Sequence, residues 1–228
     1  FARDAAMLKR VSEVLLGGTL GVGFDRMIVL DDAFARADEA VRSALEPCLN
    51  LIEVQFGARA HATLAPDGLD DWLETFRLTQ AGEIWASLGD WITEQRPVFG
   101  KGVGERFEAA SKVTQEASAA ARAKADEIAA SLDERIGDGD LLCLPTSPCI
   151  APLRGTASDA VEIGYRRRTM ALLCAAGLGG LPQLTIPVAA VDGAPVGLSI
   201  MARRGRDAGL LDFAASTFAH MSALPPNG

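Results

Sequence analysis

The sequence predicts an α/β domain in which helices cover a mixed central sheet. Three observations support this fold class: segments with apolar residues at helical spacing, short apolar runs bounded by glycine, proline or aspartate, and the alternation of the two along the chain. The composition agrees, because 49% of the 228 residues are hydrophobic and 23% are charged, which is typical of a globular protein. A chain of this length can bury a sizeable core.

Helices dominate the first part of the chain. Apolar residues recur every three or four positions in residues 2–16, 33–49, 69–92 and 105–136, and the last of these stretches is the longest. Asp31-Asp32 is placed to cap the second stretch. Two short runs of β-forming residues, 27–30 and 51–54, predict strands between the helices.

In the last third of the chain, the predicted helices are shorter and the predicted strands make up more of the sequence. Residues 141–145 predict a buried strand after the break at Gly137-Asp138-Gly139-Asp140. A helix over 166–175 is followed by strands over 183–188 and 196–201, and a final helix covers 207–220. Asp192-Gly193 between the two strands is a signal for a tight hairpin.

The stretch "LLCAAGLGGLPQLTIPV" changes from helix to strand within a few residues. Gly177, Gly179 and Gly180 let backbones approach closely, although a helical glycine costs about 1 kcal/mol relative to alanine. Pro182 prevents the helix from continuing. We expect the glycine-rich end of this helix to pack tightly beneath the sheet.

Charge and hydropathy argue against several classes of protein. Lysine and arginine total 22 against 30 acidic residues, and a net charge of −8 disfavours nonspecific nucleic-acid binding. The run Arg166-Arg167-Arg168 is typical of a solvated face. No apolar run approaches the roughly 20 residues that span a bilayer, so no membrane partner is expected. The first residues lack the pattern of a secretory signal.

The cysteines and histidines favour neither disulfides nor a metal site. The four cysteines, Cys48, Cys143, Cys149 and Cys174, are widely spread in apolar surroundings, as expected for buried thiols in a reducing compartment. We therefore expect a cytoplasmic protein. His61 and His220 stand far apart without metal-ligand spacing, and no cofactor is expected.

Several blocks taken together resemble a known family. "DLLCLPTSPCIAP", "RRRTMALLCAAGLGGLPQLTIPV" and "DGAPVGLSIMARRGRDAGLLDFA" resemble, in order, the C-terminal third of amidase-signature enzymes. "FARDAAMLKRVSEVLLG" resembles the segment after the nucleophile region of that family, and "GEIWASLGDWITEQRPVFGKGVGERF" is most similar to the amidases that include plant-type indole-3-acetamide hydrolases. The resemblance implies an amidase-signature fold, with residues 1–228 as the C-terminal part of a single domain.

The resemblance also implies a reaction whose catalytic groups lie elsewhere. The family hydrolyses a carboxamide to a carboxylate and ammonia with a serine nucleophile, a second serine in a cis peptide and a lysine, the serines lying in a GGSSGGS-like run. No such run occurs here, and none of Lys9, Lys101, Lys112 and Lys124 precedes one. We therefore expect this chain to supply scaffold and pocket walls for a small-molecule amide, with the missing N-terminal amidase half as its partner, and to be inactive alone.

Five residues are candidates for the substrate pocket: Arg106, Thr146, Ser147, Cys174 and Trp85. By the resemblance, Arg106 matches an arginine near the substrate and Cys174 lies on the helix at the pocket floor. Thr146 and Ser147 follow a strand, where open α/β sheets bind ligands. Each has a structural alternative: Arg106 on the exposed face of a helix, Thr146 and Ser147 in a proline-bounded turn, and Cys174 and Trp85 in the core.

Two further functions remain open. A truncated amidase-like domain also fits a non-catalytic binding or scaffold module. A transamidation subunit would need protein and tRNA partners, and the acidic balance and tryptophan-rich insert "DDWLETFRLTQAGEIWASLGDWITEQRP" fit a stand-alone amidase better. A homodimer is the expected default oligomeric state.

Overall fold

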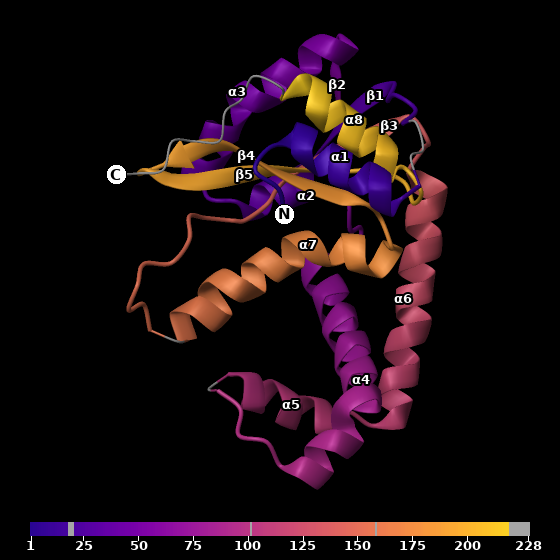
Figure 1. The fold of residues 1–228 in the computed structure, drawn as a ribbon, viewed down its shortest axis with the longest axis vertical. Helices are drawn as coiled ribbons and strands as arrows, with labels where there is room; N and C mark the ends of the chain where they lie inside the picture. Colours follow the sequence, from indigo (N-terminus) through magenta and orange to yellow (C-terminus); the bar gives the residue numbers. More distant parts are fainter. Residues whose placement is uncertain (18–20, 101, 158, 219–228) are drawn as a thin grey trace.

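The computed structural model describes residues 1–17, 21–100, 102–157 and 159–218, and its centre is a five-stranded sheet in the order β2-β1-β3-β5-β4 (Figure 1). The strands are β1 (Arg26–Leu30), β2 (Arg59–Ala62), β3 (Asp140–Pro145), β4 (Gln183–Val191) and β5 (Ala194–Met201). β1 runs parallel to β2 and β3, whereas β5 is antiparallel to β3 and β4. The predicted mixed α/β sheet is confirmed.

Helices cover both faces of the sheet (Figure 1). One apolar core lies between the sheet and α3 (Glu39–Phe56) and α8 (Asp207–Thr217). The other lies between the sheet and α4 (Leu69–Gln95), α6 (Gln115–Arg135) and α7 (Arg168–Gly179). Among the residues described, no helix is long and apolar enough to cross a membrane.

In the described part of the chain, four further helices lie around these two layers. They are α1 (Ala5–Leu15), α2 (Asp31–Arg36), α5 (Val103–Ser111) and η1 (Ala160–Arg167), the last of which is a π-helix that leads directly into α7. α1 packs on α8, and α5 packs on α4 at the end of the molecule far from the sheet (Figure 1).

The helix–strand junction at residues 172–188 is close-packed as expected, but mainly against helices. A Cβ on Gly177 would lie 2.7 Å from Phe76 of α4, and one on Gly179 would lie 2.8 Å from Leu132 of α6. Gly180, with φ of 60°, ends α7 in the left-handed conformation. The body of α7 contacts the sheet core through residues such as Leu172. The glycines therefore bring three helices together beneath the sheet.

The β4–β5 hairpin is also confirmed. Asp192 and Gly193 form the two-residue connection with φ angles of 51° and 75°. Two consecutive positive φ angles are those of a type I′ turn, whose twist matches that of the strands.

The prediction of one helix over 33–49 and a strand over 51–54 is wrong. The chain breaks at Ala37-Asp38 between α2 and α3, and α3 continues through Phe56. Its buried residues, Val41, Leu45, Cys48, Leu49 and Ile52, recur at helical spacing and outweigh the β-forming run. Asp32 does not cap a helix, because its carboxylate accepts hydrogen bonds from the amides of Leu64 and Ala65 after β2.

The long helix predicted over 105–136 is two helices, α5 and α6. Thr114 lies between them, and its hydroxyl accepts a hydrogen bond from the Ala117 amide at 3.1 Å, which caps α6. Strand β2 was not predicted, because its four-residue sequence, "RAHA", contains no β-branched or large aromatic residue. The predicted final helix reaches Thr217 in the structure, and His220 lies outside the described residues.

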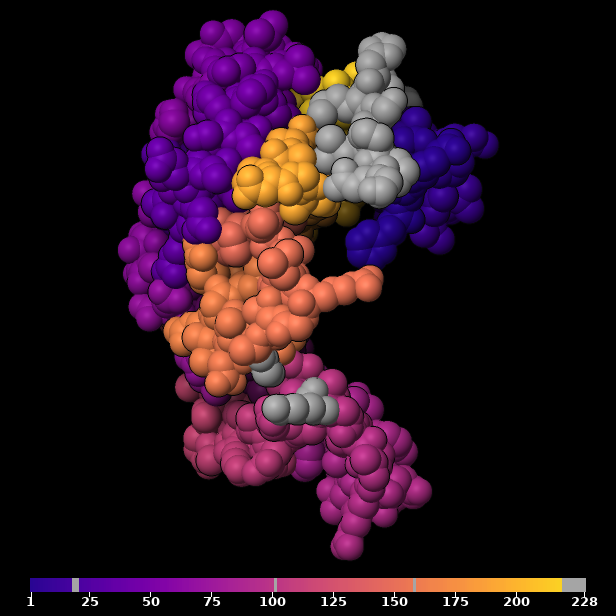
Figure 2. All heavy atoms as spheres, turned by 90° about the vertical axis from the view of Figure 1, so that its left-hand side faces the viewer, coloured from indigo at the N-terminus to yellow at the C-terminus, as the bar shows by residue number. Residues whose placement is uncertain are grey.

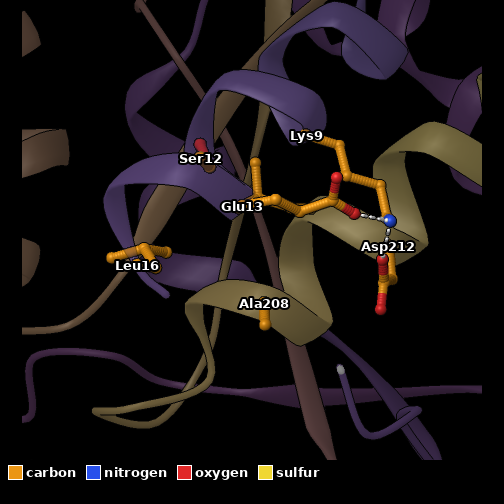
Figure 3. Close-up of a pocket in the computed structure, with 7 residues that line it drawn as sticks. Lys9, Ser12, Glu13, Leu16, Ala208 and Asp212 are labelled. Atoms are coloured by element: carbon orange, nitrogen blue, oxygen red, sulfur yellow. Dashed lines mark hydrogen bonds and ion pairs between the residues drawn. The ribbon is translucent and has the colours of Figure 1, made fainter. Parts of the chain in front are cut away.

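An ion pair and the packing of Ala5 hold helix α1 against the rest of the domain. The Lys9 ammonium is 3.2 Å from the Asp212 carboxylate of α8 and also pairs with Glu13 (Figure 3). The other Asp212 oxygen accepts the Gly21 amide at 2.9 Å. No residue of α1 is buried, and Val14 is 83% exposed. Helix α1 therefore turns apolar side chains to the surface.

An ion pair joins β1 to β3 at the start of both strands. The Arg26 guanidinium donates to both oxygens of Asp140, at 2.8 and 2.9 Å, and the Gly137 amide donates to Asp140 at 2.8 Å. Burial disfavours the charged carboxylate, but the hydrogen bonds from Arg26 and Gly137 outweigh it and lower the pKa of Asp140. The pair therefore stabilises the fold when Asp140 is ionised.

The close approach of α7 to α4 predicts that Gly177→Ala lowers the free energy of unfolding by about 1 kcal/mol, because overpacking against Phe76 exceeds the gain in helix propensity. Gly164→Ala in η1 is the matched control, because nothing lies within 4 Å of an added Cβ there. Denaturant unfolding measures both. A Gly177→Ala chain as stable as the unchanged chain would contradict this packing.

The Arg26–Asp140 pair predicts a specific acid sensitivity. Because the folded pKa of Asp140 lies below the unfolded value of about 3.9, its contribution is complete above that pH and is lost as the pH falls through the folded pKa. Asp140→Asn should lower the free energy of unfolding by about 1–3 kcal/mol near neutral pH. The free energy of unfolding of this variant should also fall less steeply as the pH is lowered. The control is Asp138→Asn, since the Asp138 side chain is exposed and pairs with Arg203 at the surface. Equal acid profiles for Asp140→Asn and the unchanged chain would refute the assignment.

Candidate functional site

A cluster of neutral polar side chains lies where β3 ends beside β5 and β4. The Ser199 hydroxyl is 2.8 Å from the Thr146 hydroxyl and 3.1 Å from the Thr185 hydroxyl, and Gln183 donates its amide to Ser199 at 3.0 Å. Ser199 is fully buried and Thr185 is exposed, so the cluster opens toward strand β4. We call these four residues the hydroxyl cluster.

Strand register builds the hydroxyl cluster. Thr185 pairs with Ser199 across the β4–β5 hairpin, and the Thr146 amide donates to the Gly197 carbonyl at 2.9 Å. A Cβ on Gly197 would lie 2.9 Å from the Thr146 hydroxyl oxygen, so glycine makes room for this hydroxyl above β5. The neighbours Leu198 and Ile200 point into the opposite core, as strand alternation requires.

The hydroxyl cluster can donate and accept hydrogen bonds but contains no base. Among the described residues, the three lysines are paired with carboxylates: Lys9 with Asp212 and Glu13, Lys112 with Glu108, and Lys124 with Asp67 and Glu127. Lys101 lies outside those residues. A hydroxyl needs an adjacent base to act as a nucleophile. The cluster is therefore suited to holding a polar ligand or segment, and the described lysines do not activate it.

The predicted pocket residue Thr146 belongs to this cluster, whereas Ser147 stabilises the turn that follows. The Ser147 hydroxyl donates to the Cys149 carbonyl at 2.8 Å, within the proline-bounded segment after β3. This contact matches the turn interpretation of Ser147. Its contact with substrate stays a prediction.

Arg106 lies elsewhere, at a cavity of about 670 Å³ formed by α4, α5 and the η1–α7 helix, which we call the helical cavity. Seen from the side, the molecule has a concave outline between its N-terminal residues (indigo) and the α4–α5 end (magenta) (Figure 2). Apolar side chains supply most of the walls, including Leu78, Ala81 and Ile84 of α4 and Phe107 of α5. The structure does not bring Arg106 and Thr146 into one cavity: Thr146 is not among the lining residues.

Charged side chains surround the helical cavity. They are Glu74 and Arg77 of α4, Arg106 of α5, and Glu162, Arg166 and Arg167 of η1. Glu162 is shared by Arg106, at 3.5 Å, and Arg166, at 3.7 Å. The expectation that residues 166–168 form a plain solvated face is therefore incomplete. Arg166 and Arg167 line a cavity, and Arg168 binds Asp38 and the Arg36 carbonyl.

Cys174 and Trp85 lie in packed surroundings. Cys174 is buried within α7, and burial raises the pKa of its thiol to about 12, so it is a protonated core residue at neutral pH. Trp85 is half-buried on α4, with its ring against Gly89. Neither side chain lines the helical cavity, and a contact of either with substrate remains a prediction.

One histidine–carboxylate pair was not predicted from the sequence. The His61 Nδ1 atom of β2 is 2.7 Å from an Asp31 oxygen at the start of α2, and both side chains are more than half exposed. The partners are thirty residues apart and meet only because β1 and β2 are parallel neighbours. In the described part of the chain, no group of three or more histidine, cysteine or acidic side chains is arranged to hold a metal ion.

Comparisons with known proteins point to one family. The sequence model of the Amidase family matches residues 43–211. Amidase 1 of Arabidopsis thaliana is 28% identical over an alignment that covers 95% of this chain and 58% of that protein. Outer envelope protein 64, chloroplastic, of the same plant is 24% identical, with 93% of this chain and 40% of that protein covered.

A solved amidase structure has the same fold, with a TM-score of 0.82 at 23% identity over 97% of this chain and 52% of that one. The chain thus spans about half the length of the amidases that it matches. The match over residues 43–211 and the similarity to plant amidases confirm the resemblance seen in the sequence: this chain belongs to the Amidase family.

Proposed function

We propose that this chain is the C-terminal part of an amidase-signature domain and supplies scaffold and substrate-pocket walls for amide hydrolysis. The reaction converts a carboxamide and water to a carboxylate and ammonia. In this proposal the nucleophilic serine, the second serine and the activating lysine lie on polypeptide outside the 228 residues.

The asymmetry of the match to Arabidopsis Amidase 1 carries this proposal. Nearly all of this chain, 95%, aligns with 58% of that protein, so more than a third of the relative has no counterpart here. The printed sequence also lacks a glycine- and serine-rich run. An amide carbonyl requires an activated nucleophile and donors aimed at the developing oxyanion.

The chemistry of the described residues also supports a nucleophile that lies outside this chain. The hydroxyl cluster around Ser199 is uncharged, and the described lysines are bound to carboxylates. The thiols of Cys48 and Cys174 have pKa values raised by burial to about 11 and 12, so neither is an available thiolate nucleophile near neutral pH. We propose that Thr146 and Thr185 face the pocket that the other part of the domain completes.

A non-catalytic binding or scaffold module is the second candidate. One specific observation favours it: the similarity over 93% of the chain to Outer envelope protein 64, whose name describes an envelope component and not an amidase. The same scaffold therefore occurs in relatives that are not named for amide hydrolysis.

Serine-directed labelling distinguishes the two functions. A fluorophosphonate probe should leave the purified 228-residue chain unlabelled, because the described hydroxyls lack an activating base. The chain produced together with the polypeptide encoded upstream of it should be labelled at a serine of that upstream polypeptide. In-gel fluorescence and peptide mass spectrometry read the result.

Ser199→Ala provides the matched control for the isolated chain, because it removes the buried hydroxyl of the cluster. We expect the signal to stay at background in both forms. Labelling of the isolated chain that disappears in Ser199→Ala would place the nucleophile on this chain and refute the proposal. A complete protein that stays unlabelled would favour the non-catalytic module.

A further inference from the structure

The helical cavity combines an apolar interior with a cationic border. Its volume of about 670 Å³ lies within the usual range for small-molecule sites. Leu78, Ala81 and Ile84 of α4 line it together with Phe107 of α5 and Val113 just after α5. These walls offer an apolar ligand a place where water is poorly held.

The charges around the helical cavity do not balance. Of its charged lining residues, four are arginines and two are glutamates. Glu162 serves both Arg106 and Arg166, and Arg77 is paired with Glu74. Asp70, the carboxylate nearest to Arg167 at 3.8 Å, is held more closely by Arg36 at 2.5 Å. Three carboxylates, Glu74, Glu162 and Asp70, therefore pair with four guanidinium groups, and Asp70 is shared with Arg36, which leaves an excess of positive charge beside the cavity.

The π-helix η1 places two of these arginines, Arg166 and Arg167, at the helical cavity. Glu162, Ile163, Arg166 and Arg167 follow one another at the spacing of one helix face, and all four line the cavity. π-helical turns are rare and occur frequently at functional sites. The irregular segment is thus the part of the η1–α7 helix that borders the cavity.

We propose that the helical cavity binds a small amphipathic carboxylate with an aromatic or branched aliphatic body. The body lies between α4 and α5, and the carboxylate meets the guanidinium groups of Arg166 and Arg167. Guanidinium groups bind carboxylates through paired, charge-assisted hydrogen bonds. This binding belongs to the described chain alone and does not depend on where the hydrolytic residues lie.

Two probes of similar shape and different charge test the proposal on the 228-residue chain. By isothermal titration calorimetry, 1-naphthaleneacetate should bind, and the neutral 1-naphthaleneethanol should bind about tenfold more weakly. Raising the salt concentration to about 0.5 M should reduce this difference, because salt screens exposed charges. Equal affinity for the two probes, or no binding of the anion, would overturn the proposal.

Variants assign the binding to this cavity. Arg166→Gln with Arg167→Gln should weaken the anion about tenfold and leave the neutral probe unchanged, whereas Ala81→Phe should fill the cavity and weaken both. Arg122→Gln is the matched control, because Arg122 pairs with Glu83 on the surface and does not line the cavity. Anion binding that survives Ala81→Phe would place the probe elsewhere, for instance on exposed α1, and would contradict the proposal.

Discussion

The pairing of β3 with β5 is the constraint on which the rest of the structure depends. All six residues of β3 are buried, and this strand joins the parallel pair β1 and β2 to the antiparallel hairpin of β4 and β5. Because side chains alternate across the sheet, the same register sends Leu198 and Ile200 into one core and Ser199 toward the other face. A shift of one residue would expose that core and dismantle the hydroxyl cluster.

The two candidate regions differ in what holds them. The hydroxyl cluster is fixed by backbone pairing and by a glycine that makes room for Thr146, so its geometry is as rigid as the sheet. The helical cavity is bounded by helices and surface ion pairs, which contribute little energy individually. Its shape is therefore easier to change by mutation without unfolding the sheet. The exposed apolar face of α1 supports the proposal that further polypeptide completes the domain.

Much of the fold could be predicted because its signals are local. The Asp192-Gly193 turn and the buried run of β3 each lie within one short window, and α4 extends over 27 consecutive residues without a break. The errors came from competition between signals. Residues 51–54 have β-forming side chains, but they are helical because the buried face of α3 continues through them. The division between α5 and α6 depends on the helix cap at Thr114.

The site was harder to predict because its contacts are long-range. Ser199 meets Thr146 across 53 residues of sequence, and His61 meets Asp31 only through strand pairing. Arg166 and Arg167 looked like a solvated run, because the helices that enclose them come from a distant part of the sequence. The resemblance identified the family, whereas the local sequence pattern could not show which side chains share a cavity.

We propose that this chain contributes the walls of the substrate pocket and that another stretch of polypeptide contributes the nucleophile. Ammonia release by the purified 228-residue chain, free of any other protein and offered a panel of aromatic and aliphatic carboxamides, tests it most directly. We expect release at the rate of the buffer blank for every amide. Sustained release above that blank by the chain alone would contradict it.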